Sequence, residues 1–139
     1  MHLSRRLQIK MKIEINNLTK SRIDKRFLEK VAKQTFKILK IKLPEVSLAI
    51  VGNAKIKEIN KKYRKKNKVT DVLSFDYGEI FICLPQAKKQ AKQLNHPFKK
   101  ELAILLIHGI LHLAGYKDET KKDYKNLLRK EKEVCQKII

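Results

Sequence analysis

Residues 97–118 read PFKKELAILLIHGILHLAGYKD, the most apolar segment of the chain. After its two lysines the run is apolar almost all round, which is typical of a helix that is buried on every side. Pro97 suits the first position of a helix, and Gly115 can adopt the left-handed conformation that ends one. The sequence therefore predicts a buried central helix over residues 97–114, around which the other elements must pack.

The segments on either side of this helix predict a mixture of strands and helices. Residues 8–16 alternate between apolar and polar side chains, which is the period of a half-buried strand. Residues 24–40 instead carry apolar side chains on one helical stripe, and a helix capped by Asn53 is expected to turn Tyr63 toward the interior. The predicted strands are residues 8–16, 46–51, 72–75 and 80–83, and the predicted helices are residues 24–40, the segment from Asn53, the segment after Pro85, residues 97–114 and residues 120–137.

This order of elements predicts a single α+β domain over residues 1–139. We expect a small mixed β-sheet of about four strands, packed with about five helices around the central helix. Residues 1–7 carry positive charge without a following apolar run, so we expect them to form a flexible tail rather than a signal peptide.

The composition limits the classes of function. The two cysteines, Cys83 and Cys135, form no CxxC pair, so a reducing cytoplasm is the expected setting. Lys and Arg number 34 against 14 Asp and Glu, which gives a formal net charge of +20. This excess favours a polyanionic partner, above all nucleic acid, over a merely solvated basic surface. No apolar run reaches the ~20 residues that a membrane span needs, so we expect no membrane partner.

The pattern that carries chemistry lies at the end of the predicted central helix. His108 and His112 are four residues apart and share one helical face, where both imidazoles can reach one metal ion. Gly115 allows the chain to turn back, and Asp118 then occupies the third-ligand position of the extended zinc motif H-E-x-x-H-x-x-G-x-x-H. The sequence predicts one divalent transition-metal ion, zinc first, held by these three residues, with Glu119 as the alternative third ligand. Two histidines hydrogen-bonded within the core are the other interpretation of the pair.

Gly109 distinguishes this motif from that of the metallopeptidases. It stands where those enzymes carry a glutamate that serves as general base. A peptidase would therefore need a carboxylate from elsewhere in the chain, such as Glu79 or Glu101. This substitution makes a metallopeptidase the least favoured of the functions considered.

The motif resembles that of the YbeY family, the rRNA-maturation endoribonucleases that bind a metal through H-G-x-L-H-L-x-G-Y-D-H. Residues 108–116 read HGILHLAGY, and residues 70–75 read TDVLSF, as in the family's second pattern. The resemblance implies an α+β fold and places Arg64 at the family's functionally important arginine. The family's final D-H falls on Lys117-Asp118, so the third ligand is Asp rather than His. A centre with Asp carries one less positive charge and should lower the pKa of a bound water less strongly.

The resemblance implies a metal-dependent, single-strand-specific endoribonuclease, a hydrolase of phosphodiester bonds. Family members process rRNA, above all the 3′ end of the small-subunit RNA, and take part in ribosome quality control in the bacterial cytoplasm. RNA and the small ribosomal subunit are therefore the expected partners, and DNA is not. We expect Arg64 to act on the phosphate, while Tyr77 and Tyr116 could stack on bases or simply pack. The alternative is a metal-stabilised RNA- or ribosome-binding assembly factor with little nuclease activity, because no general base can be named.

Overall fold

The computed structural model describes residues 12–41 and 45–139, so the predicted tail and the first residues of the strand predicted at 8–16 lie outside the described part. The strands are β1 (Lys12–Asn17), β2 (Glu45–Val51), β3 (Val72–Phe75) and β4 (Glu79–Cys83). The helices are α2 (Lys25–Leu39), α3 (Asn53–Arg64), α4 (Leu84–Gln93), α5 (Phe98–Leu113) and α6 (Lys121–Ile138). Within the described residues, the predicted α+β class with four strands and five helices is confirmed.

The four strands form one mixed sheet in the order β1-β2-β4-β3. β1, β2 and β4 are parallel, whereas β3 pairs antiparallel with β4 and lies at one edge of the sheet. The turn between β3 and β4 requires Gly78, because its φ is +98° and an added Cβ atom would lie 2.8 Å from the Glu45 carbonyl oxygen. The tight turn places Phe75 and Tyr77 at the tip of this hairpin.

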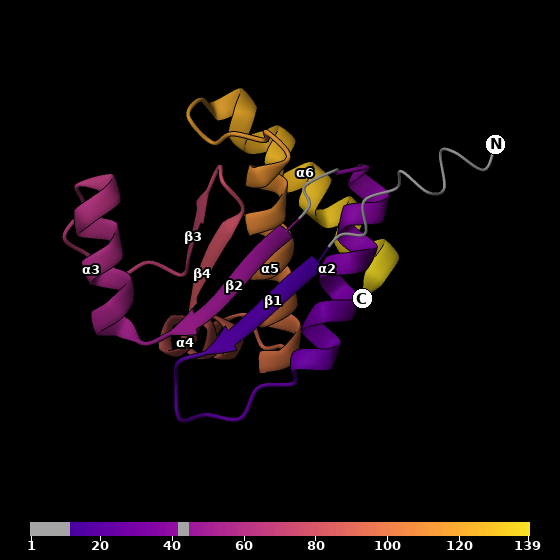
Figure 1. Cartoon of the computed structure of the whole chain (residues 1–139). Coiled ribbons are helices and arrows are strands. Elements are labelled where there is room, and N and C mark those ends of the chain that lie inside the picture. Colours follow the sequence, from indigo (N-terminus) through magenta and orange to yellow (C-terminus); the bar gives the residue numbers. More distant parts are fainter. Residues whose placement is uncertain (1–11, 42–44) are drawn as a thin grey trace.

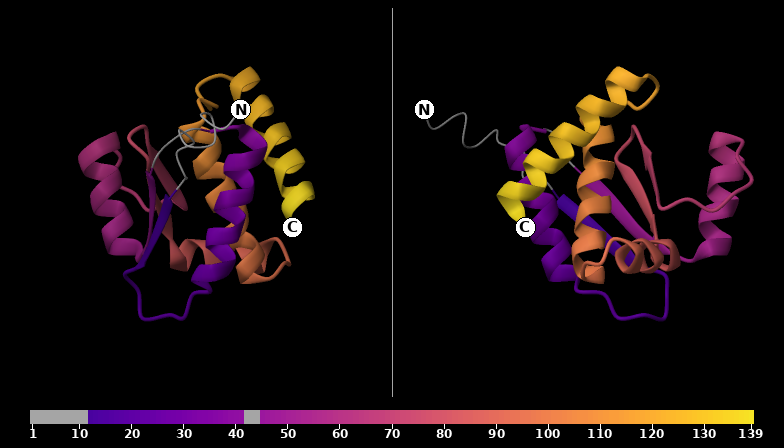
Figure 2. Two further views of the ribbon diagram at one scale, coloured as in Figure 1. Left: turned by 45° about the vertical axis from the view of Figure 1, so that its right-hand side comes forward. Right: turned by 180° about the vertical axis from the view of Figure 1, so that it is seen from behind.

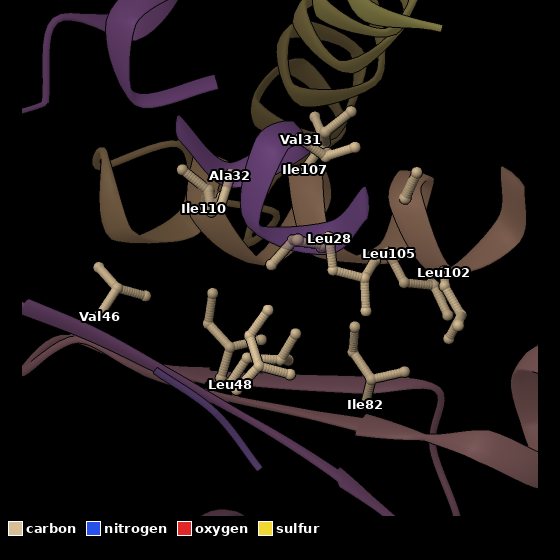
Figure 3. Close-up of a cluster of buried hydrophobic side chains, with 14 of the residues drawn as sticks. Leu28, Val31, Ala32, Val46, Leu48, Ile82, Leu102, Leu105, Ile107 and Ile110 are labelled. Carbon is tan, nitrogen blue, oxygen red and sulfur yellow. The ribbon is translucent and has the colours of Figure 1, made fainter. Parts of the chain in front are cut away.

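Helices cover the two faces of the sheet unequally. Figures 1 and 2 show α3 on one face and α2, α5 and α6 on the other. Figure 3 shows Val46, Leu48 and Ile82 pointing from the strands toward α2 and α5, where they form the larger core. The smaller core, on the face that α3 covers, consists of Ala49, Val51, Ile56, Ile59, Leu73 and Cys83.

The central helix α5 lies close against the sheet, as predicted. Gly109 permits this approach, because an added Cβ atom would lie 2.9 Å from Cγ2 of Ile80. The hydroxyl of Ser74 donates a hydrogen bond to the Gly109 carbonyl at 2.9 Å and so joins β3 to the same turn of α5. These contacts fix the last turns of α5, which carry His108 and His112, against the β3–β4 hairpin.

Three details of the predicted helices are wrong. Gly52 rather than Asn53 is the N-cap of α3, and Asn53 instead accepts a hydrogen bond from the Cys83 thiol at 3.2 Å. Pro97 is the N-cap of α5 rather than its first helical residue. Tyr63 is 56% exposed rather than buried, and its ring meets Phe75 edge-on, with 5.5 Å between ring centroids.

The last helix, α6, packs on α5 and α2 and completes the larger core. Thr120 and Asp123 form a capping box at its start, in which each side chain accepts a hydrogen bond from the other residue's backbone N–H. Leu127 and Val134 are buried on its inner face. None of the helices in the described part of the chain is both long and apolar enough to cross a membrane.

Candidate metal centre

His108 and His112 lie on consecutive turns at the C-terminal end of α5, the end that adjoins the β3–β4 hairpin (Figure 1). Their Nε2 atoms are 3.1 Å apart, and their ring centroids are 4.8 Å apart. A spacing of four residues puts the two side chains on one face of the helix, where their rings can converge. The structure therefore brings the two side chains to one point, while their role as ligands stays a prediction.

Glu131 of α6 contacts the other nitrogen of His108. Its Oε1 atom lies 2.7 Å from Nδ1, and its side chain is only 16% exposed. A carboxylate at this distance favours the proton on Nδ1 and leaves the Nε2 lone pair directed at His112. Carboxylates in this position commonly orient metal-binding histidines. Sequence reasoning missed Glu131, because 23 residues separate it from His108 and no local pattern connects them.

The two histidines differ in their affinity for protons. Burial alone lowers the pKa of His108, but its hydrogen bond to Glu131 and the charge of that carboxylate more than offset burial, so the pKa lies above its ordinary value. Burial and the neighbouring His108 lower the pKa of His112 below its ordinary value. The pair therefore consists of one imidazole held by a carboxylate and one that remains neutral more readily.

The predicted third ligand lies in the loop between α5 and α6. Gly115 has a φ of +100° and its N–H donates to the His112 carbonyl, while the N–H of Tyr116 donates to the Leu111 carbonyl. This is the Schellman pattern, and it turns the chain back as the glycine predicted. Asp118 is exposed in this loop, and its negative charge acts on both histidines. It adds to the raised pKa of His108 and partly opposes the lowering of the pKa of His112.

The residues present fit a divalent metal ion at two positions rather than three. Two nitrogen ligands about 2.05 Å from a tetrahedral zinc ion are separated by about 3.3 Å, close to the distance between the two Nε2 atoms. Across residues 12–41 and 45–139, however, no three His, Cys, Asp or Glu side chains are grouped closely enough to hold a metal. Asp118 and the alternative, Glu119, therefore remain predictions.

Arg64, the predicted catalytic arginine, is the last residue of α3 and reaches across the edge of the sheet toward the histidines. Its Nη2 donates a hydrogen bond of 2.6 Å to the Ser74 carbonyl, and its Cζ lies 5.2 Å from the centroid of the Phe75 ring. Its positive charge contributes to the lowered pKa of His112. These contacts hold the guanidinium at the edge strand and place its charge beside the histidine pair.

A cleft of about 820 Å³ joins these groups. Both histidines, Arg64 and the loop from Gly115 line it, so the structure gathers every predicted site residue around one space. Its other charged side chains are the basic Lys66, Lys68 and Lys117 and the acidic Asp71, Asp76, Asp118 and Glu119. The cleft therefore offers both cations for a phosphate and carboxylates that could accept a proton.

The surroundings of the histidines argue against a metallopeptidase. Gly109 faces Ile80 of the sheet so closely that a larger residue there would displace the Ile80 side chain, and the glycine itself supplies no base after the first histidine. Neither Glu79 nor Glu101 lines the cleft. Glu101 lies seven residues before His108 on α5, about 10 Å along the helix axis, and contacts His96 and Gln90.

Comparison with known proteins identifies the family. A family model described as Endoribonuclease YbeY matches residues 8–139. The chain belongs to the YbeY family. This match confirms the resemblance seen in the sequence, and it spans the whole of the described fold.

Individual YbeY relatives are similar over most of their length. A protein from Phytoplasma australiense named Endoribonuclease YbeY is 36% identical over 141 residues, covering 92% of this chain and 96% of its own. A protein of the same name from Sulfurihydrogenibium sp. is 38% identical over 126 residues, covering 82% and 83%. A Thermotoga maritima protein solved in solution is 33% identical with a TM-score of 0.66, covering 91% of this chain and 89% of that one. Sequence and fold therefore agree on one family of endoribonucleases.

Proposed function

We propose that this protein is a metal-dependent endoribonuclease that cleaves single-stranded RNA. Its membership of the YbeY family supports endonucleolytic cleavage of RNA. The observation that carries metal dependence is the convergence of the His108 and His112 Nε2 atoms, 3.1 Å apart in a cleft that Arg64 also lines. Paired imidazole nitrogens in a cleft with an adjacent cation suit hydrolysis of a phosphodiester.

Four residues would form and support the metal centre. His108 and His112 would hold the ion through Nε2, and Asp118 would join them from the loop that Gly115 turns back. Glu131 would keep the proton of His108 on Nδ1, so that Nε2 presents its lone pair. An ion bound there would polarise a phosphoryl oxygen or lower the pKa of a water molecule.

Arg64 would hold the phosphate group that is cleaved. A guanidinium keeps its charge at every physiological pH and can contact two phosphoryl oxygens at once. Its hydrogen bond to the Ser74 carbonyl fixes one side of the group. Because the arginine is anchored before the substrate arrives, its charge needs little reorganisation as negative charge develops on the phosphate.

We further propose that the substrate is rRNA, with the 3′ end of the small-subunit RNA as the main target. The small ribosomal subunit would be the partner, and rRNA maturation and ribosome quality control in the cytoplasm the setting. The formal net charge of +20 supports binding to a structured polyanion. Lysines that contact phosphates add affinity without reading sequence, so target choice would depend on the accessibility of unpaired RNA.

One assay distinguishes this function from its alternatives. The protein, supplied with zinc or manganese, is incubated with single-stranded RNA and separately with casein, with and without a chelator. We expect the protein to cleave the RNA but not the casein, and we expect the chelator to abolish cleavage of the RNA. Cleavage that survives chelation would exclude metal dependence, and tight RNA binding without cleavage would favour the assembly factor. Cleavage of casein would support the metallopeptidase function instead.

The role of Arg64 has a separate test. We expect Arg64→Ala to lower the cleavage rate by about 10²- to 10³-fold, the usual cost of removing one group that stabilises developing charge. Metal content, measured by elemental analysis, should not change. Arg129→Ala is the matched control, because Arg129 is an exposed arginine of α6 that bonds Asn126 within its own helix. Equal losses of metal and activity in Arg64→Ala would contradict a role on the phosphate.

A further inference from the structure

Three aromatic rings form a continuous strip beside the cleft. Phe75, the last residue of β3, meets Tyr63 of α3 edge-on with 5.5 Å between centroids. Phe75 is also stacked with Tyr77 of the hairpin turn, with 5.8 Å between centroids and 14° between ring planes. We refer to Tyr63, Phe75 and Tyr77 as the aromatic strip.

The outer rings of the aromatic strip are not part of a core. Tyr63 is 56% exposed and Tyr77 is 69% exposed, whereas Phe75 is half-buried and packs edge-on against Phe81 at 6.0 Å. The chain has no tryptophan and four tyrosines, so two of its four tyrosines lie in this one exposed strip. Packing explains the position of Phe75 but not that of the two tyrosines, whose rings are largely open to solvent.

Arg64 connects the aromatic strip to the cleft. Its guanidinium lies over the Phe75 ring and donates to the carbonyl of Ser74, and Arg64 and Ser74 both line the cleft. Asp76, which stands between two rings of the strip in the sequence, lines the cleft as well. Because Asn60 and Arg64 of α3 line the cleft together with the histidines of α5, the cleft reaches round the edge strand β3 to the face of the sheet on which the strip lies.

The charges around the aromatic strip select the kind of occupant. The exposed Lys61, Lys62 and Lys65 lie on the last turn of α3 and its C-cap, and the Nζ atom of Lys62 lies 5.3 Å from the Tyr63 ring centroid. The acidic Asp76 and Glu79 lie beside Tyr77, so the cations gather at the Tyr63 end of the strip. Exposed aromatic rings among cations are the arrangement that binds single-stranded nucleic acid, where rings stack on bases and cations contact phosphates. A purely apolar partner would leave these ammonium groups desolvated and unpaired.

We propose that the aromatic strip stacks on an unpaired nucleobase of RNA, next to the phosphate held at Arg64. This inference rests on the proposed function and adds to it a base-binding subsite with Tyr77 as its outer ring. Stacking tolerates any base but requires that the base be unpaired. The strip would therefore make the enzyme select single strands, since a base within a duplex cannot turn its face to Tyr77.

The test measures binding, so it does not depend on catalysis. Fluorescence anisotropy of the full chain in excess chelator is followed with a labelled single-stranded RNA of twelve nucleotides and with a strand of the same length that lacks all its bases. We expect Tyr77→Ala to weaken binding of the intact strand by about 5- to 100-fold, the range for loss of one stacked base. Binding of the abasic strand should be unchanged, which also shows that the variant is folded. Tyr77→Phe should bind as the wild type does.

Tyr124→Ala is the matched control, because Tyr124 is 50% exposed on α6 and does not line the cleft. Its binding to both strands should equal that of the wild type. The inference is overturned if Tyr77→Ala and Tyr63→Ala bind the intact strand as tightly as Tyr124→Ala does. The same holds if the wild type does not distinguish the intact strand from the abasic one. A wild-type protein that binds neither strand would overturn the proposed function itself, so the two failures are distinguishable.

Discussion

The two ends of α5 each carry a contact between a histidine and a glutamate, and the two contacts are nearly equal in length. At the N-terminal end, His96 Nε2 lies 2.6 Å from Glu101 Oε1. At the C-terminal end, His108 Nδ1 lies 2.7 Å from Glu131 Oε1. Distance alone does not distinguish them, yet of these four residues His108 alone lines the cleft.

The difference lies in what the remaining polar atoms face. Glu101 is only 3% exposed, and its second oxygen accepts a hydrogen bond from Gln90 at 2.8 Å. This cluster is closed and joins α4 to α5. In the other pair the glutamate holds Nδ1 and leaves Nε2 to face His112 across 3.1 Å. A buried pair whose hydrogen bonds are complete contributes to stability, whereas one that leaves a lone pair directed into a cleft is available for chemistry.

The largest expected difference between the two ends follows from removing one histidine at each. We expect His112→Ala to reduce bound metal and RNA cleavage to background, because a single imidazole and one carboxylate from an exposed loop hold a divalent ion weakly. His96→Ala should retain metal at the wild-type level, because His96 is remote from the cleft. Elemental analysis after dialysis against zinc measures both. Full metal content in His112→Ala would remove the basis of the proposed centre.

Removing one carboxylate charge at each end gives the next largest effect. Glu131→Gln should weaken metal affinity by roughly 10- to 100-fold, the usual cost of altering a group that orients a metal-binding histidine. Glu101→Gln is the matched control and should leave metal affinity unchanged. Competition with a chromophoric chelator measures both constants. Equal affinities in the two variants would show that Glu131 only packs.

The free energy of unfolding should respond in the opposite order, with the larger loss from the substitution at the N-terminal end of α5. Glu101→Ala should lower the free energy of unfolding by about 1–3 kcal/mol, because it leaves His96 and Gln90 without their common partner in a buried position. Glu131→Ala should cost less in the metal-free protein, because its surroundings are partly open to water. Urea denaturation without metal compares the two, and a greater loss in Glu131→Ala would contradict this assignment.

The smallest expected effect is in proton binding by the metal-free protein. The pKa of His108 lies above 6.5 and that of His112 below it, and Glu131→Gln should lower the first value. The stabilising contribution of His108 is therefore complete below pH 6.5 and is lost as the pH rises through its folded-state pKa. The contribution of His112 to stability is present above pH 6.5 and is lost as the pH falls through the folded-state pKa of His112. Titration of the ring resonances by NMR checks the order, and a His112 that titrates above His108 would contradict it.

Much of the site could be predicted because its signals are local. The pairing of His108 with His112 follows from one helical period, and the turn at Gly115 follows from the one residue type that readily adopts a positive φ. The apolar run at residues 72–75 predicted the strand β3, although not its place at the edge of the sheet or its contact with Arg64. The error at Tyr63 has a physical reason as well: a helical stripe predicts which side faces the sheet, but not how far along the helix the sheet continues to cover it.

The periodicity of each segment predicts the α+β class, the buried central helix and the placing of two imidazoles on one helical face. The contact between Glu131 and His108 cannot be predicted in this way, because it depends on the angle at which α6 crosses α5. The tertiary structure also decided that Arg64 reaches round the edge strand and that two tyrosines stay exposed beside it. Contacts between distant elements arise from the packing of whole faces against one another, and no local pattern records which side chains then meet.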